Sequence, residues 1–383
     1  MPTLALLLSA VAVAGPPQRL ESYDGPWQHM RVIQPQQYVA YRTSEPVVID
    51  GRGDDAAWQS AEWTAPFVDI EGDRKPRPQF LTRAKMTWDD DYFYVFARLD
   101  EPHVWATLTE KNSVMFQDND FEVFIDPDGD NHDYYEFEMN ALNTIWELSL
   151  GRPYMDGGPL RNPHNIDGVR TAVHIDGTLN DAGDEDSGWS VEIAFPWEGL
   201  ARHRGAAHTP PRDGDQWRVG FSRVEWMVNI VDGKYVKVPR TERPEDNWVW
   251  SPQGLINMHR PERWGFVQFS TAAPGTAEFV DDPTLPARDW LMGIYHRQRA
   301  YREQFGHYAD SLDLLGMNAE DRPEIVTDAT IEMTEASADT PADKTNGKDA
   351  DKAVQRGYLV TVQLQFPDGT TRPLRLQHDS RLW

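Results

Sequence analysis

Residues 117–143 hold two runs of alternating apolar and polar side chains on either side of an acidic turn. Both runs, Phe121–Asp126 and Tyr134–Asn140, have the two-residue period of a β-strand, in which successive Cβ atoms point to opposite faces. The intervening Pro127–Asp133 is rich in Asp, Asn and Gly, which favour turns. The stretch predicts a hairpin with one apolar and one polar face. The polar face would carry Glu122, Glu136, Glu138 and Asn140.

Similar short runs occur along most of the chain. Roughly ten or more of them, separated by turn residues, precede residue 285, and helical periodicity is almost absent there, a pattern typical of an all-β sandwich. Arg83–Trp88 and Tyr92–Leu99, for example, flank Asp89–Asp91 as a second predicted hairpin. We therefore predict a mainly β protein built on a β-sandwich over residues 38–271.

The pattern changes after residue 285. Apolar residues at near-helical spacing within 287–316 predict an amphipathic helix, and Ile325–Thr334 and Gly357–Phe366 alternate as strands. Residues 335–352 contain no large apolar residue, which predicts a disordered insertion. Residues 287–383 are thus expected to form a C-terminal helix-plus-β-hairpin appendix.

The first residues predict export. Leu4–Ala14 is an apolar run of the length found in signal peptides, and small residues at Ala12 and Ala14 precede Gly15 as in a cleavage site. We expect a signal peptide over 1–14, an irregular leader over 15–37, and a periplasmic, cell-surface or extracellular location. No other stretch approaches the ~18 apolar residues of a membrane span.

Charge and cysteine content exclude several classes of function. A formal net charge of −25 argues against nucleic acid or an anionic membrane as a partner, because both reward clustered Lys and Arg. The absence of cysteine excludes disulfides, thiolate zinc sites and cysteine nucleophiles. The 15 tryptophans can fill a β-sandwich core or stack on sugar rings.

Five phrases follow one another along the chain. They are Pro46–Gly51 with Ala57–Trp58, Met86–Val95, Asn119–Pro127, Gly188–Pro196 and Arg263–Val267. In content and order they resemble carbohydrate-binding module family 9 and the free-standing family 9-like proteins, over about residues 38–270. The resemblance implies an antiparallel β-sandwich related to that of DOMON-type haem and sugar binders. For the xylanase-attached members it implies binding of sugars at reducing ends.

The resemblance also implies a ligand site. Family modules clamp a sugar between two tryptophans, and the matching residues here are Phe116 and Met258. The glutamate and asparagine of the family site match Glu122 and Asn140, whereas the family arginine is replaced by Glu138. The expected carbohydrate-binding residues are these five, and no catalytic residue is predicted.

The turn between the two strands is a candidate calcium site. Calcium takes six to eight oxygen ligands, and Asp126, Asp128 and Asp130 around Gly129 could supply several. Asp, Asn and Gly are equally the ordinary residues of a hairpin turn, so both interpretations stay open. The resemblance to family 9 proteins, members of which bind calcium structurally, adds support to the metal without deciding between the two interpretations.

Three functions are compatible with these patterns. The first is recognition of a mono- or oligosaccharide in polysaccharide breakdown, by ring stacking and hydrogen bonds to hydroxyls. The second is a glycoside hydrolase acting through two carboxylates on the same face, ~5–9.5 Å apart. The third is a cell-surface structural or assembly protein that uses its C-terminal appendix. The sequence does not determine the sugar or the oligomeric state.

Overall fold

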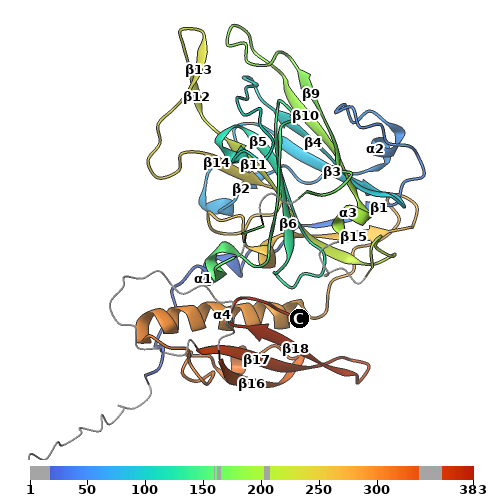
Figure 1. Ribbon diagram of the computed structural model, residues 1–383. Helices are drawn as coiled ribbons and strands as arrows, with labels where there is room; N and C mark the ends of the chain where they lie inside the picture. The colour runs from blue at the N-terminus through green and yellow to red at the C-terminus, as the bar shows by residue number, and fades with distance from the viewer. Residues whose placement is uncertain (1–17, 159, 162–164, 202–207, 336–355) are drawn as a thin grey trace, which may run out of the picture.

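The structure is a computed structural model that describes residues 18–158, 160–161, 165–201, 208–335 and 356–383. The described part is mainly β, as expected, and has two sheets stacked as a sandwich above a smaller C-terminal unit (Figure 1). The signal peptide predicted for 1–14 lies outside the described residues. So does nearly all of the insertion predicted for 335–352, of which only Glu335 is described, as the last residue of a strand.

The larger sheet has nine strands within the described residues. Its central order is β1-β15-β11-β5-β6-β7-β8; in addition, β14 pairs with β11, and β2 pairs with β14. All of its pairings are antiparallel except that of β1 with β15, which is parallel. The strands are β1 (Gln37–Tyr41), β2 (Val68–Asp69), β5 (Asp120–Asp126), β6 (Tyr134–Asn140), β7 (Ile145–Leu150), β8 (Leu160–Arg161), β11 (Gln216–Glu225), β14 (Asp246–Val249) and β15 (Gly265–Ser270).

The smaller sheet is antiparallel and has the order β3-β4-β10-β9. The hydrophobic core lies between the two sheets, where Phe137 of β6 meets Phe195 of β10 with ring centroids 5.3 Å apart. This burial of one face of each sheet is why the strands alternate in character. The strands are β3 (Thr82–Trp88), β4 (Tyr92–Asp100), β9 (Arg170–Asp176) and β10 (Gly188–Pro196), and a separate hairpin is formed by β12 (Val228–Val231) and β13 (Lys234–Lys237).

Short helical segments connect the strands. They are the α-helices α1 (Trp27–Met30), α2 (Ala56–Ser60) and α3 (Trp197–Leu200), and the 3-10 turns η1 (Gly72–Arg74), η2 (Met115–Gln117), η3 (Tyr154–Asp156), η4 (Pro261–Arg263) and η5 (Ala319–Asp321). The turns η2, η3 and η4 lie close in sequence to the residues of the candidate site.

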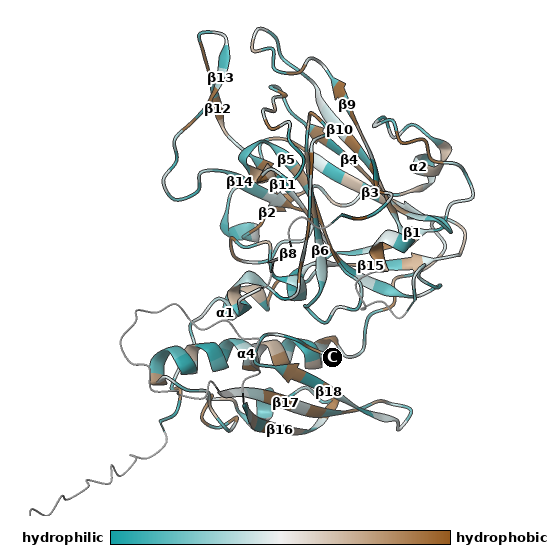
Figure 2. Cartoon of the chain, in the orientation of Figure 1, coloured by the Kyte–Doolittle hydropathy of each residue, from teal (hydrophilic) through white to brown (hydrophobic). Residues whose placement is uncertain are grey.

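The C-terminal unit is one long helix on a three-stranded antiparallel sheet, where the sequence predicted a helix and a hairpin. The helix carries both hydrophilic and hydrophobic residues (Figure 2), and its buried side chains include Leu291, Ile294 and Tyr301. Its last turn ends at Gly306, whose φ of 79° suits a glycine at the C-terminus of a helix. The elements are α4 (Leu285–Phe305), β16 (Val326–Glu335), β17 (Arg356–Gln365) and β18 (Thr371–Gln377).

The predicted irregular leader is partly wrong. Residues 27–30 form α1, and Gln37 already belongs to β1. Leu20, Trp27 and Met30 are buried in the same apolar cluster as the inner face of α4 and the strands beneath it. The leader therefore joins the C-terminal unit to the sandwich, a contact between distant parts of the chain that local sequence patterns do not reveal.

No helix in the described part of the chain is both long and apolar enough to span a membrane.

Candidate functional site

The polar face of the central hairpin is where the candidate site lies, and it forms as predicted. Within the larger sheet Glu122 of β5 pairs with Glu138 of β6, and Asp120 pairs with Asn140 one step along. On either side of the two glutamates, β11 contributes Ser222 opposite Glu122 and β7 contributes Trp146 opposite Glu138. Glu136 lies two residues before Glu138 in β6 and therefore on the same face of the sheet.

The carboxylates of this face are buried and incompletely hydrogen-bonded. Asp120, Glu122, Glu136 and Glu138 each keep one buried oxygen without a partner. Among the described residues, no Lys or Arg forms an ion pair with any of the four. We refer to these four residues as the acidic row.

Burial and mutual repulsion make the acidic row hard to ionise. Burial raises the pKa of Glu122 to about 7. Burial, followed by the nearby charge of Glu122, raises the pKa of Glu136 to about 8. The pKa values of Asp120 and Glu138 lie well above the usual range, first from burial and then from the other carboxylates. Near neutral pH the row is thus poised to share protons or to bind a group that supplies positive charge or donors.

A donor and a histidine lie beside the row. The buried indole Nε1 of Trp146 has no hydrogen-bond partner. His259 shares a 2.9 Å hydrogen bond through Nδ1 with the hydroxyl of Tyr134, and its Nε2 lies 3.8 Å from Oε1 of Glu136. Burial, with a contribution from Arg260, lowers the pKa of His259 to about 3, so the ring is neutral and offers one donor and one acceptor.

Tyr154 is the exposed aromatic residue beside this cluster. Its side chain is 46 % exposed, and its ring meets that of His259 edge-on with centroids 4.4 Å apart. Burial, together with the charges of Glu136 and Glu138, raises the pKa of its hydroxyl, which places Tyr154 in the field of the acidic row. Sequence reasoning missed Tyr154 because η3 is a single turn in a Gly/Pro-rich loop, where no periodic pattern points to a face.

Asn140 is fully used by the protein itself. Its Nδ2 donates to the carbonyl of Leu108 and to Asp118, at 2.9 and 3.0 Å. Its Oδ1 accepts from the backbone N–H groups of Leu142 and Thr144, both at 3.0 Å. An amide has two donors and two acceptor positions, so none is left for a sugar. The predicted ligand role of Asn140 does not agree with this geometry; the residue anchors the β6–β7 turn to the loop before β5.

The two predicted clamp residues lie in different environments. Phe116 in η2 is 40 % exposed, and its carbonyl accepts the indole N–H of Trp226. Met258 is only 8 % exposed and belongs to an apolar cluster with Met115, Phe124 and other residues of the sheet face. A clamp that holds a sugar ring from both sides requires two exposed side chains, and only Phe116 of the pair is exposed. Their role as a clamp stays a prediction.

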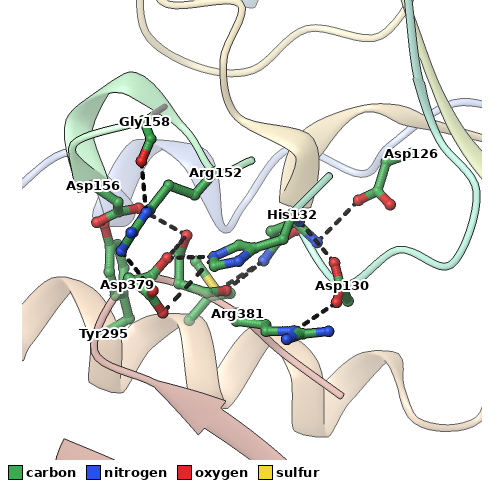
Figure 3. Close-up of polar contacts among 12 residues, drawn as sticks. Asp126, Asp130, His132, Arg152, Asp156, Gly158, Tyr295, Asp379 and Arg381 are labelled. Carbon is green, nitrogen blue, oxygen red and sulfur yellow. Dashed lines mark hydrogen bonds and ion pairs between the residues drawn. The ribbon is translucent and has the colours of Figure 1, made fainter. Parts of the chain in front are cut away.

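The acidic turn connects the sandwich to the C-terminal unit (Figure 3). Asp130 pairs with Arg381 at 2.9 Å, and a ring nitrogen of His132 lies 2.8 Å from the carbonyl oxygen of Asp379. The carboxylate of Asp379 also pairs with Arg152 at 3.0 Å. Asn131 donates to the carbonyl of Ser380 at 2.9 Å.

The acidic turn also contains hydrogen bonds between its own residues. Asp126 accepts the N–H groups of Gly129 and Asn131, both at 3.0 Å. Oxygens of Asp126, Asp128 and Asp130 nonetheless lie within 4.8 Å of one another, close enough to share one cation. The structure thus places the three predicted ligands together, and calcium at this turn stays a prediction.

The fold is a β-sandwich, and its larger sheet carries the acidic row on one face. Residues 49–225 match the family model described as "Carbohydrate family 9 binding domain-like". The match includes the acidic row and Tyr154. The relation to DOMON-type proteins stays a prediction.

Two curated relatives are large enzymes. The chain is 27 % identical over 160 residues to endo-1,4-beta-xylanase A of Thermoanaerobacterium saccharolyticum, which covers 41 % of this chain and 11 % of the relative. It is 26 % identical over 155 residues to exoglucanase XynX of Acetivibrio thermocellus, which covers 40 % of this chain and 12 % of the relative. The chain therefore spans about a tenth of the length of these relatives.

Solved structures of the same module family are also similar. A family 9 carbohydrate-binding module from Caldicellulosiruptor kristjanssonii, in complex with cellotriose, is 17 % identical with a TM-score of 0.41. That similarity covers 64 % of this chain and 100 % of the module. The glucose complex of a module from the same organism gives the same identity and TM-score.

Proposed function

We propose that this protein binds a carbohydrate at the acidic row, with Glu136 and Glu138 as the main hydrogen-bonding residues. The observation that carries the proposal is the set of buried polar atoms without partners on this sheet face. Buried polar groups are nearly always hydrogen-bonded in folded proteins, so a cluster of unpartnered ones marks a place where a ligand completes the network.

The chemistry of those atoms suits hydroxyl groups. The carboxylate oxygens of Glu136 and Glu138 need donors, and the indole N–H of Trp146 needs an acceptor. A hydroxyl supplies both at once, and a sugar carries several at fixed spacing. Neutral His259 beside Glu136 adds one further donor or acceptor.

Tyr154 supplies the apolar part of the proposed site. An exposed aromatic ring can stack on the C–H face of a sugar while its hydroxyl stays hydrated. The buried oxygens of the row are shielded from water, so a ligand can reach them only when a covering side chain moves. We assign that movement to Tyr154, the exposed member of the group.

The spacing of the carboxylates favours binding over hydrolysis. Oxygens of Asp120, Glu122 and Glu138 lie within 4.8 Å of one another. The carboxyl groups that flank a glycosidic bond are ~5–9.5 Å apart, and the wider, inverting pairs leave room for a water molecule. The nearest oxygens of these three acids are closer together than that, so the glycoside hydrolase is the weaker alternative.

We further propose that the protein is exported and acts in the recognition of plant-type polysaccharides. The apolar N-terminal run supports export. The matches to a xylanase and an exoglucanase support β-1,4-linked glucose or xylose polymers as the ligand class. For the acidic turn we propose a structural calcium ion held by Asp126, Asp128 and Asp130.

Calorimetric titration with xylo- and cello-oligosaccharides tests the binding proposal. We expect one of the two series to bind, and Glu136→Gln and Glu138→Gln each to weaken binding by about tenfold, because the amide replaces one oxygen of the carboxyl group by an NH2 group that cannot accept a hydrogen bond. Glu303→Gln is the control, since Glu303 is exposed on α4. Absence of binding to both series, or equal affinity in all four proteins, would contradict the proposal. Release of shorter sugars during the titration would instead support the hydrolase.

A further inference from the structure

Asp120, Glu122 and Glu138 form a second group of three acids, separate from the acidic turn. They belong to β5 and β6, where Glu122 and Glu138 are directly paired. One oxygen from each lies within 4.8 Å of the others, and all three residues are buried. Because both strands are central in the larger sheet, the backbone holds these positions rigidly.

The neighbours of the group leave its charge uncompensated. Among the described residues, none of the three forms an ion pair, and each keeps a buried oxygen without a hydrogen-bond partner. Glu136, a fourth buried acid, also keeps an unpartnered oxygen and lies on the same face. An isolated buried carboxylate costs several kcal/mol relative to water, so a rigid group of them calls for a positive partner.

From this geometry we infer that Asp120, Glu122 and Glu138 bind a divalent cation, with calcium as the best fit. Calcium prefers carboxylate oxygens at 2.3–2.6 Å, so two oxygens on opposite sides of one ion are up to ~5 Å apart. The spacing of the three oxygens falls within that limit. The absence of histidine or cysteine from the group of three argues against zinc, which prefers nitrogen and sulfur ligands.

The cation site and the sugar site are adjacent and share Glu138. Glu136, His259 and Tyr154 lie toward one end of the face, and Asp120 lies at the other end. One oxygen of Glu138 can therefore hold the ion while the other accepts from a sugar hydroxyl. The cation site does not depend on the sugar, and it can be tested alone.

Calcium titration of the full chain after removal of metals with EDTA tests the inference. Calorimetry without sugar measures the affinity, and the melting temperature with and without calcium measures the stabilisation. We expect Asp120→Asn, Glu122→Gln and Glu138→Gln each to weaken one calcium site by at least about tenfold, because affinity follows the number of charged ligands. Without calcium these variants should melt no lower than the natural protein, since each change removes a repelling buried charge.

Two further variants keep the outcome unambiguous. Asp128→Asn changes the acidic turn, so a calcium site that it removes belongs to the turn, and the inference is overturned if that is the one calcium site that the titration detects. Glu303→Gln is the matched control for a general loss of negative charge. No calcium binding by the natural protein, or unchanged binding in Glu122→Gln and Glu138→Gln, would also overturn it.

Sugar titration in EDTA separates this inference from the proposed function. Sugar binding that persists without calcium uptake would refute the cation site and leave the carbohydrate site standing. Calcium uptake at this face without binding of any sugar would support the cation site and refute the carbohydrate site.

Discussion

At the level of single residues, the acidic row is defined by buried carboxyl oxygens that have no hydrogen-bond partner. Glu122 and Glu138 face each other in adjacent strands, as the alternation of the sequence predicts. The sequence cannot show that their oxygens remain without partners, because that depends on loops from distant parts of the chain. Nor can the sequence show that the side-chain amide of Asn140 makes all its hydrogen bonds within the protein, to Leu108, to Asp118 and to the turn that follows Asn140.

Tyr154 provides the first prediction. We expect Tyr154→Ala to weaken sugar binding by roughly 2- to 10-fold, the value of one aromatic contact of 0.5–1.5 kcal/mol. Tyr154→Phe keeps the ring and should bind nearly as well as the natural protein. Calorimetry with the oligosaccharide that binds measures both variants. A loss confined to Phe116→Ala would instead support the clamp derived from the family resemblance.

At the level of elements, the acidic turn links β5 and β6 to the C-terminal residues. Asn131 is buried, has a φ of 72° and donates to the carbonyl of Ser380. Arg381 in the same interface is about half exposed and contributes an ion pair with Asp130. Buried and exposed contacts of this kind differ in strength, although the sequence shows both only as polar residues in turns.

This difference gives the second prediction. Asn131→Ala should lower the free energy of unfolding by about 1–3 kcal/mol. It leaves the carbonyl of Ser380 without its donor, and it places alanine at a positive φ, which alanine adopts less readily than asparagine. Arg381→Ala should cost about 1 kcal/mol, because Arg381 is half exposed and water can partly replace it beside the buried Asp130. Denaturant titration in low salt measures both. A larger loss in Arg381→Ala would show that the exposed pair dominates the interface.

His296 on α4 gives the third prediction. Its ring is buried, stacks on Trp27 at 5.2 Å and lies 3.9 Å from Glu262. Burial lowers the pKa of His296, although the nearby carboxylate of Glu262 partly offsets this effect. The unfolded chain therefore takes up a proton below about pH 6.5 that the folded chain resists, and stability falls as the pH drops from 7.5 to 5.5.

The pH dependence can be assigned with a single variant. His296→Gln should reduce the slope of unfolding free energy against pH in this window by up to about 1.4 kcal/mol per pH unit, the value for one proton. His307→Gln is the control, because His307 is exposed. An identical slope in His296→Gln and the natural protein would show that other groups cause the acid sensitivity.

At the level of the whole molecule, the chain behaves as one packed body of two units. Leu20, Trp27 and Met30 from the start of the described chain share an apolar cluster with α4. Arg263 beside β15 is buried and pairs with Asp289 of α4 at 3.3 Å. The C-terminal unit is therefore packed against the sandwich.

This packing gives the fourth prediction. The two units should unfold in a single thermal transition, with equal calorimetric and van't Hoff enthalpies, because separating them exposes apolar surface and leaves buried charges unpaired. Differential scanning calorimetry of the full chain measures this. Two resolved transitions would show that the interface is too weak to couple the units.

Much of this architecture follows from local patterns, and the rest does not. The hairpin of β5 and β6, the hairpin of β3 and β4, and the long α4 all have the residue periodicity of their element. The docking of the leader and the position of Tyr154 depend on contacts between residues far apart in sequence. Local alternation predicts which face a residue occupies, but it does not predict what covers that face.

A crystal structure of the protein with a bound xylo- or cello-oligosaccharide tests the central claim most directly. We predict a sugar ring with hydroxyls within hydrogen-bond distance of Glu136 and Glu138 and with one face against Tyr154. A sugar bound elsewhere, with the acidic row still covered and without contact to it, would contradict the account.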